Sequence, residues 1–235
     1  ASENSKKSRF HIAQEHIVGL PEDMRKCLRR QNFKNNKYSI LYASTTLYSG
    51  NRGITVLVGS SDISKANFEI NFIENVLSKI PHTVHYKPYY SKRYAGPSPE
   101  IEIAKTKDNI HINEDEVDLR YIASSSRIII TSRATSTIGW CVVSGKPLIY
   151  IENEDSRLSI EARKEFKKNL FYFDVLEKNW DTNLHSFLSQ PIEKIEKEWK
   201  TKMVFKQKFI EKYFGSQKTN AEKKCASILL KDILS

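Results

Sequence analysis

Three hydroxyl side chains follow one another where an apolar run passes into a helical pattern. Thr135, Ser136 and Thr137 stand between "RIIITS" and "TSTIGWCVVSG". The first turn of a helix has unpaired backbone N–H groups and the positive end of the helix dipole, and both suit a phosphate. Small hydroxyl residues add donors there without adding bulk. The stretch predicts a phosphate site, although a plain helix N-cap explains the same motif.

A basic and aromatic stretch follows another predicted strand. In "YKPYYSKRY" the cations Lys87, Lys92 and Arg93 alternate with tyrosines. Cations beside aromatic rings suit a phosphate that carries a sugar or a base. A solvated surface loop has the same composition, so the stretch leaves that alternative open.

Two further strand ends carry polar residues. Ser44 and Thr45 follow the run "YSILYA", where they could line a cleft. Glu152 closes the run "PLIYIE", where its carboxylate is placed to accept the hydroxyls of a sugar or ribose. An exposed carboxylate without a function is the alternative for Glu152.

The sequence lacks the motifs that are typical of nucleotide hydrolases and dinucleotide dehydrogenases. The sequence has no "GxxxxGK[ST]" phosphate loop, no "GxGxxG" after a strand and no "GxSxG" nucleophile elbow. Its three cysteines and six histidines lack the spacing of metal ligands. We therefore predict no metal site and no cofactor, and the sequence assigns no catalytic residue.

The pattern of elements predicts an α/β fold. Strand candidates lie at about 38–45, 54–60, 83–89, 109–113, 127–132, 147–152 and 170–175. Helical patterns lie at about 61–80, 116–125 and 135–145, the first with apolar residues at Ile63, Ala66, Ile70, Ile73 and Leu77. Alternating strands and helices predict a Rossmann-like parallel sheet covered on both faces. Residues 1–36 read as a polar leader with a short helical segment, and 37–235 as the Rossmann-like domain, with C-terminal helices from about 183.

The net charge of +10 lies at the two ends of the chain. Residues 1–37 carry nine Lys/Arg and four Asp/Glu, residues 191–235 carry eleven and six, and the stretch between them carries eighteen of each. A nucleic-acid enzyme would gather its cations around the site, so we predict no nucleic-acid partner. Basic ends fit an anionic membrane surface or an acidic partner, and solvated helix faces are the alternative. No apolar run is long enough to span a membrane. Because an odd number of cysteines argues against a disulfide framework, we expect a protein of the reducing cytoplasm, peripheral at the inner face of the plasma membrane.

The order of these motifs resembles a known family. "ILYASTT", "VHYKPYYSKRY", "NIHIN", "RIIITSRATSTIGWCVVSGKPLIYIEN" and the tail "IEKEWKTKMVFKQKFIEKYF" resemble the C-terminal, donor-binding half of GT-B type glycosyltransferases. The similarity covers about residues 37–215 and is closest to bacterial surface-carbohydrate biosynthesis transferases. Many of those relatives have His-Pro where this chain has Lys87-Pro88.

The resemblance implies a function and its partners. Lys87 and the Thr135–Thr137 turn would approach the phosphates of a nucleotide-sugar donor, and Glu152 would touch the donor's hydroxyls. The donor's sugar would pass to a glycan or a lipid-linked acceptor in surface polysaccharide biosynthesis. A GT-B enzyme needs two Rossmann-like domains, so the resemblance also implies an N-terminal half or a partner subunit. A non-catalytic assembly or membrane-docking module, a nucleotide-sugar epimerase and a polyglycerol-phosphate transferase relative are the alternatives.

Overall fold

A six-stranded parallel sheet forms the centre of the protein. The computed structural model describes residues 38–45, 48, 61–89, 98–113, 118–202, 206–215 and 221–234. The strands are β1 (Tyr38–Ala43), β2 (Val84–Lys87), β3 (Ile110–Ile112), β4 (Ser126–Ser132), β5 (Leu148–Glu152) and β6 (Phe171–Asp174). They lie in the order β3-β2-β1-β4-β5-β6, and each neighbouring pair is parallel. This arrangement confirms the predicted α/β, Rossmann-like fold class. The predicted strand at 54–60 and the predicted leader at 1–36 lie outside the described residues.

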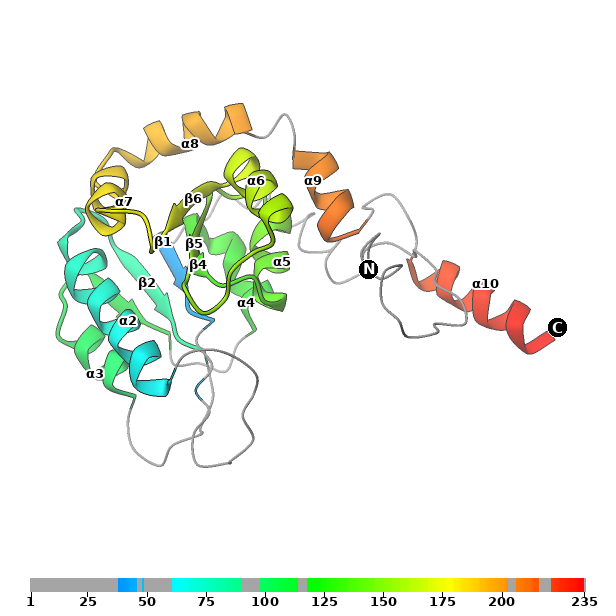
Figure 1. Ribbon diagram of the computed structural model, residues 1–235, viewed down its shortest axis with the longest axis horizontal. Helices are drawn as coiled ribbons and strands as arrows, with labels where there is room; N and C mark the ends of the chain where they lie inside the picture. The colour runs from blue at the N-terminus through cyan, green and yellow to red at the C-terminus, as the bar shows by residue number, and fades with distance from the viewer. Residues whose placement is uncertain are drawn as a thin grey trace.

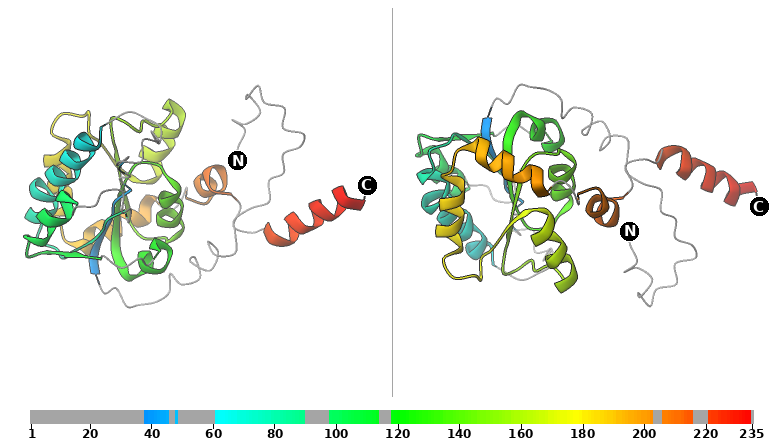
Figure 2. Two further views of the ribbon diagram at one scale, coloured as in Figure 1. Left: turned by 90° about the horizontal axis from the view of Figure 1, so that it is seen from below. Right: turned by 90° about the horizontal axis from the view of Figure 1, so that it is seen from above.

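Helices cover both faces of the sheet. The helices α2 (Asp62–Asn75), α3 (Pro99–Lys105) and α7 (Trp180–Leu188) lie on one face, while α4 (Leu119–Ile122), α5 (Ser136–Val143) and α6 (Ile160–Asn169) lie on the other (Figures 1 and 2). Short 3-10 turns, Leu77–Lys79 and Ala123–Ser125, precede β2 and β4. The helices after Leu188 are α8 (Ile192–Lys202), α9 (Lys206–Tyr213) and α10 (Ala221–Leu234).

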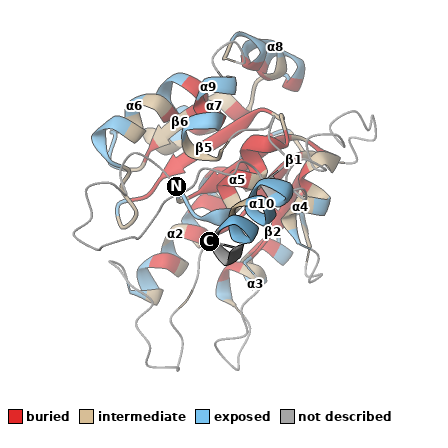
Figure 3. Ribbon diagram, turned by 90° about the vertical axis from the view of Figure 1, so that its right-hand side faces the viewer, coloured by how far each residue is buried: buried red, intermediate tan, exposed pale blue. Residues whose placement is uncertain are grey.

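The strands form the core because their side chains are apolar on both faces, as a sheet covered on both sides requires. The inner segments of β1, β4 and β5 have no exposed surface, which covers Ile40–Tyr42, Ile128–Ile130 and Leu148–Ile151. Figure 3 shows the buried strands between helices whose outer surfaces are exposed.

The buried stripe of α2 agrees only in part with the predicted one. Ile73 and Leu77 are buried as predicted, but Ile63 is 73% exposed, and Lys65, Glu69 and Phe72 are buried in addition. A carboxylate can occupy this stripe because Glu69 accepts hydrogen bonds from buried hydroxyl groups, which offset the cost of its burial. Ser61 caps the helix by accepting a hydrogen bond from the Ser64 backbone N–H.

Helix α8 contacts the sheet at the amino ends of β4 and β5. Arg127, near the start of β4, donates to Glu196 at 2.9 and 2.6 Å and pairs with Glu193 at 2.7 Å. The Trp199 indole donates to the carbonyl oxygen of Gly145 at 3.0 Å. The opposite edge of the sheet, where the strands end, is therefore free of this helix.

The C-terminal helices differ in their packing. Phe209 and Ile210 of α9 are buried, and Phe209 packs edge-to-face on Phe166 of α6 with ring centroids 5.3 Å apart. Helix α10 lies apart from the sheet (Figure 1) and leaves Leu229 and Leu230 exposed. In the part of the chain that the structure describes, no helix is both long and apolar enough to cross a membrane.

Candidate functional site

The strand order reverses between β1 and β4. The carboxyl ends of the strands together form one side of the sheet, called the carboxyl edge below. From β1 the chain moves through β2 to β3 on one side, and β4 then returns to pair with β1 on the other. Connections leave a strand order of this kind on opposite faces, so a crevice forms between them, and ligands of open α/β sheets bind there. The predicted site residues that the structure describes all lie along this edge.

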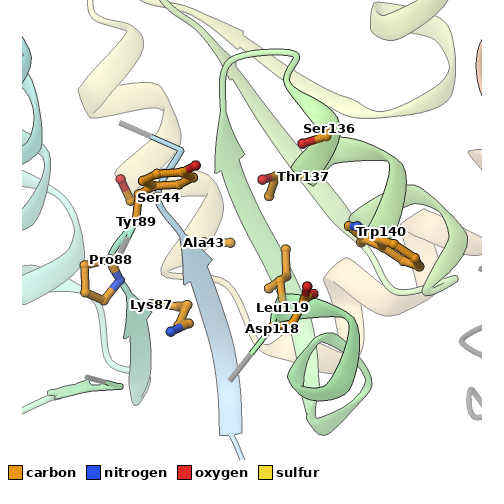
Figure 4. A pocket seen from close by; sticks show the side chains of 10 residues that line it. All are labelled: Ala43, Ser44, Lys87, Pro88, Tyr89, Asp118, Leu119, Ser136, Thr137 and Trp140. Carbon is orange, nitrogen blue, oxygen red and sulfur yellow. The ribbon is translucent and has the colours of Figure 1, made fainter. Parts of the chain in front are cut away.

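A pocket of about 310 Å³ occupies this crevice. Its wall comes from the ends of β1 and β2 on one side and from α4 and α5 on the other (Figure 4). The lining residues are Ala43, Ser44, Lys87, Pro88, Tyr89, Asp118, Leu119, Ser136, Thr137 and Trp140. Four of the predicted residues, Ser44, Lys87, Ser136 and Thr137, are therefore brought together.

The three consecutive hydroxyl residues have different roles. Thr135 is the N-cap of α5, and its side-chain oxygen accepts a hydrogen bond from the Thr137 backbone N–H at 3.4 Å. Ser136 and Thr137 begin the helix and line the pocket. The N-cap interpretation therefore holds for Thr135, and the phosphate contacts of Ser136 and Thr137 stay a prediction.

Lys87 ends β2 and is only 9% exposed. Its ammonium group lies in the field of Asp118, which lines the same pocket. The pKa of Asp118 is held below its ordinary range mainly by a hydrogen bond from Arg120, with a smaller contribution from the charge of Lys87. The pocket thus contains one carboxylate that stays ionised beside a buried cation, with space between them and α5.

An aromatic ring supplies the apolar side of the pocket. Trp140 lies one helical turn after Thr137, so it shares that residue's face of α5. The Arg120 guanidinium sits 4.9 Å from the centre of its ring. A base or ribose could pack on the indole while phosphates meet Ser136 and Thr137.

Ser44 and Thr45 are fixed in place by hydrogen bonds. The hydroxyl of Ser44 donates to Glu69 at 3.0 Å, and the hydroxyl of Tyr42 donates to the same oxygen at 2.8 Å. Burial, together with the charge of Glu69, raises the pKa of Tyr42, so the phenol stays protonated and remains a donor. Thr45 does not line the pocket; its hydroxyl donates to the carbonyl oxygen of Ser132 and joins the ends of β1 and β4.

Glu152 has a different surrounding from the one predicted. It is fully buried, and its oxygens accept hydrogen bonds from the Leu158 backbone N–H, from the Tyr172 hydroxyl and, at 2.8 Å, from Arg163. Arg157 lies 3.4 Å away. The carboxylate is satisfied by the loop and helix that follow β5, and it does not line the pocket, so its geometry does not support contact with donor hydroxyls.

Two predicted cations cannot be placed. Lys92 and Arg93 lie outside the described residues, and their part in a phosphate site stays a prediction. Among the residues searched, no group of three His, Cys, Asp or Glu side chains could hold a metal ion.

Sequence reasoning missed Asp118, Leu119 and Trp140. Trp140 could have been found, because it follows Thr137 at the three-residue spacing that places two side chains on one helix face. Asp118 had a weaker signal as the N-cap of the short helix α4.

Comparisons with known proteins concern the fold. No protein-family model matches the chain, and no curated protein matches its sequence. Among solved structures it is similar to the spinosyn forosaminyltransferase SpnP (13% identity, 92% of this chain and 48% of that one, TM-score 0.46). It is also similar to MurG of Acinetobacter baumannii (12%, 94% and 57%, TM-score 0.45) and to Os79 of O. sativa (10%, 90% and 47%, TM-score 0.49).

The chain therefore spans about half the length of the solved structures that it matches. The chain is similar to one part of each of these structures.

Proposed function

We propose that the chain is the donor-binding part of a GT-B type glycosyltransferase and that the pocket between β1, β2 and α5 holds the diphosphate of a nucleotide-sugar. One observation carries this proposal: the buried cation Lys87 and the first turn of α5, with Ser136 and Thr137, line the same pocket. A cation facing a helix N-terminus across a crevice is an arrangement that suits a diphosphate better than any neutral ligand.

The proposed reaction is sugar transfer. The bond between the sugar's anomeric carbon and the diphosphate oxygen breaks, and an acceptor oxygen forms the new bond as its proton leaves. Negative charge then grows on the departing nucleoside diphosphate. Lys87, the N–H groups of α5 and the two hydroxyls would stabilise that charge in place. Trp140 would hold the nucleoside and keep water from one side of the pocket. No described residue is assigned as the base.

The wider role follows the sequence resemblance. The acceptor would be a glycan or a lipid-linked sugar of a bacterial surface polysaccharide, at the inner face of the plasma membrane. A second Rossmann-like domain, on the same chain or on a partner subunit, would bring the acceptor to the donor. An epimerase or a polyglycerol-phosphate transferase would use the same diphosphate contacts. A docking module would not need Lys87 at the pocket, and this favours the transferase.

Nucleotide titrations test the proposal. We expect UDP, CDP or GDP at millimolar concentration to shift the Trp140 indole resonance in a ¹H–¹⁵N spectrum. Because a hydrogen bond to a charged group contributes about 1.5–3 kcal/mol, Lys87→Met should weaken binding by roughly 10- to 150-fold. Thr137→Val removes one hydroxyl at nearly constant volume and should weaken it roughly fivefold.

Lys105→Met is the matched control, because Lys105 is a half-exposed lysine of α3 outside the pocket. It should bind nucleotides as the parent does. If none of the three nucleotides shifts Trp140, or if Lys87→Met binds them with the parent affinity, the proposal is wrong.

A further inference from the structure

A second hollow of about 610 Å³ lies at the same edge of the sheet. It shares no lining residue with the first pocket. One side is the start of α2, and the other is formed by residues that directly follow β4, β5 and β6. The lining residues are Ser61, Ser64, Lys65, Phe68, Arg133, Asn153, Glu154, Asp155 and Val175. The carboxyl ends of three neighbouring strands thus converge on it, as they do at ligand sites of α/β proteins.

Two nitrogen donors in this lining have no acceptor within the described part of the chain. Asn153 is 4% exposed, and its Nδ2 atom is buried without a hydrogen-bond partner there. The Nε atom of Arg133 is in the same situation. Buried donors are nearly always satisfied, so two of them around one hollow require acceptor oxygens from outside the described protein, which water or a ligand with acceptor oxygens supplies.

Arg133 is also held in an unusual conformation. It is the first residue after β4 and has a φ of 73°, in the left-handed region that residues with a Cβ atom rarely adopt. A salt bridge of 2.7 Å to Asp155, whose side chain is 7% exposed, fixes its guanidinium across the hollow. The fold therefore holds this side chain against the lining despite a strained backbone.

The charges of the lining cancel. The lining contains two cations, Lys65 and Arg133, and two carboxylates, Glu154 and Asp155. Both cations are already paired, Arg133 with Asp155 at 2.7 Å and Lys65 with Asp62, outside the lining, at 3.2 Å. A phosphate would have to displace these pairs. A neutral ligand with both donors and acceptors would not, because its oxygens can accept from the unpaired nitrogens while its hydroxyls donate to the carboxylates.

The apolar wall agrees with that ligand class. Phe68 lines the hollow and stacks on Trp180 of α7, with ring centroids 6.1 Å apart. An aromatic ring beside hydroxyl-binding groups suits a sugar, which has C–H bonds on one face and hydroxyl groups at its rim.

We propose that this hollow binds a carbohydrate or polyol at a site separate from the first pocket. Asn153 and Arg133 donate to its oxygens, and Asp155 or Glu154 accepts from its hydroxyls. The ligand has two possible sources, the group that an activated donor carries or a free acceptor glycan. The inference does not depend on nucleotide binding in the first pocket.

The test is a titration of the ¹⁵N-labelled chain with glucose, N-acetylglucosamine and glycerol, and separately with UDP-glucose and UDP. The Asn153 side-chain amide and the Trp180 indole report on the hollow. We expect at least one of these hydroxyl-rich compounds to shift both signals. Asn153→Leu removes a donor that has no partner in the described protein, so it should leave the melting temperature unchanged or higher and weaken binding roughly tenfold, read from Trp180. Ser64→Trp fills the hollow from an exposed position of α2 and should abolish binding.

Thr137→Val, in the first pocket, is the control and should leave binding of free sugars unchanged. Shifts caused by free sugars identify an acceptor site. Shifts caused by UDP-glucose, but by neither UDP nor free sugars, identify the group carried by the donor. The proposal is overturned if no compound shifts either signal, or if Ser64→Trp binds with the parent affinity. Sugar binding that persists while nucleotides fail to bind would reject the proposed donor site and keep this one.

Discussion

Glu152 is a strand-end carboxylate that serves the fold. It is buried at the end of β5, and both of its oxygens accept hydrogen bonds from within the protein. Its residue type and its position are also those expected of a sugar-binding carboxylate. Only the surrounding residues distinguish a structural role from a sugar-binding role.

Glu152→Gln should lower the free energy of unfolding by about 2–3 kcal/mol, because Arg163 and Tyr172 would lose a charged acceptor in a buried place. Urea denaturation measures this change. Glu161→Gln is the control, since its exposed pair with Lys212 contributes little. A stable Glu152→Gln protein with weakened nucleotide-sugar binding would restore the donor-contact role.

The sequence allowed part of the site to be predicted. Ser44, Lys87, Ser136 and Thr137 line one pocket because parallel strands place their carboxyl ends at one edge. The fate of Glu152 could not be predicted, since its partners lie up to twenty residues further along the chain. The sequence also does not show which of the neighbouring hydroxyl residues caps α5 and which line the pocket, because this depends on the backbone conformation.

An arginine side chain connects the loop after β5 to the end of β6. Arg157 donates to both oxygens of Asp174 at 2.6 Å. It also lies 3.4 Å from Glu152. Residues 153–155 of this loop line the second hollow, so the same ion pairs that close the loop shape that site.

Asp174→Asn should make stability less dependent on pH in the acid range. The hydrogen bond from Arg157 holds the pKa of Asp174 below its ordinary range, so below the ordinary value of about 3.9 the unfolded chain binds the proton more readily than the folded one. The parent should keep this contribution above that value and lose it as pH falls through the lowered folded-state pKa.

Urea midpoints measured at several pH values check this prediction. The midpoint of the parent should fall more steeply with acidification than that of Asp174→Asn. Asp181→Asn, at a residue of α7 with no salt bridge in the described part of the chain, should follow the parent. Equal slopes for the parent and Asp174→Asn would show that Arg157 does not couple this carboxyl to folding.

The sequence analysis did not predict α3 and α6, which have no apolar stripe. In α6, "IEARKEFKKN", only Phe166 and Asn169 are buried, so hydrophobic periodicity gives little signal. In α3, "PEIEIAK", apolar and charged residues alternate at the period of a strand. Strands β4 and β5 and helix α5 were predictable because they are largely apolar and are followed by or end at small or polar residues.

The basic ends of the chain flank a body without net charge. The two ends carry +5 each, and residues 38–190 carry eighteen charges of either sign. Helix α10 presents part of this basic surface with exposed leucines beside it. An anionic membrane surface would match both features.

We expect the chain to co-sediment with phosphatidylserine vesicles at low salt and to be released at high salt, because electrostatic docking is screened. Replacing Lys223 and Lys224 of α10 by Glu should weaken binding by more than the roughly fivefold per lysine that about 1 kcal/mol represents. Replacing Lys105 and Lys107, in the neutral body, by Glu should have little effect. Binding that resists salt, or equal losses in the two variants, would argue against docking through α10.

The pairing of β1 with β4 also has a consequence for biosynthesis. Ile40 lies opposite Ile128, so the two central strands are separated by more than eighty residues of chain. On a ribosome, β1, β2 and β3 can associate while one edge of β1 still lacks its neighbour, and that edge remains open until Ser132 has left the exit tunnel. A pause in translation before that point would leave this edge of the apolar strand β1 unpaired, so nascent-chain aggregation should depend on how quickly ribosomes reach the end of β4.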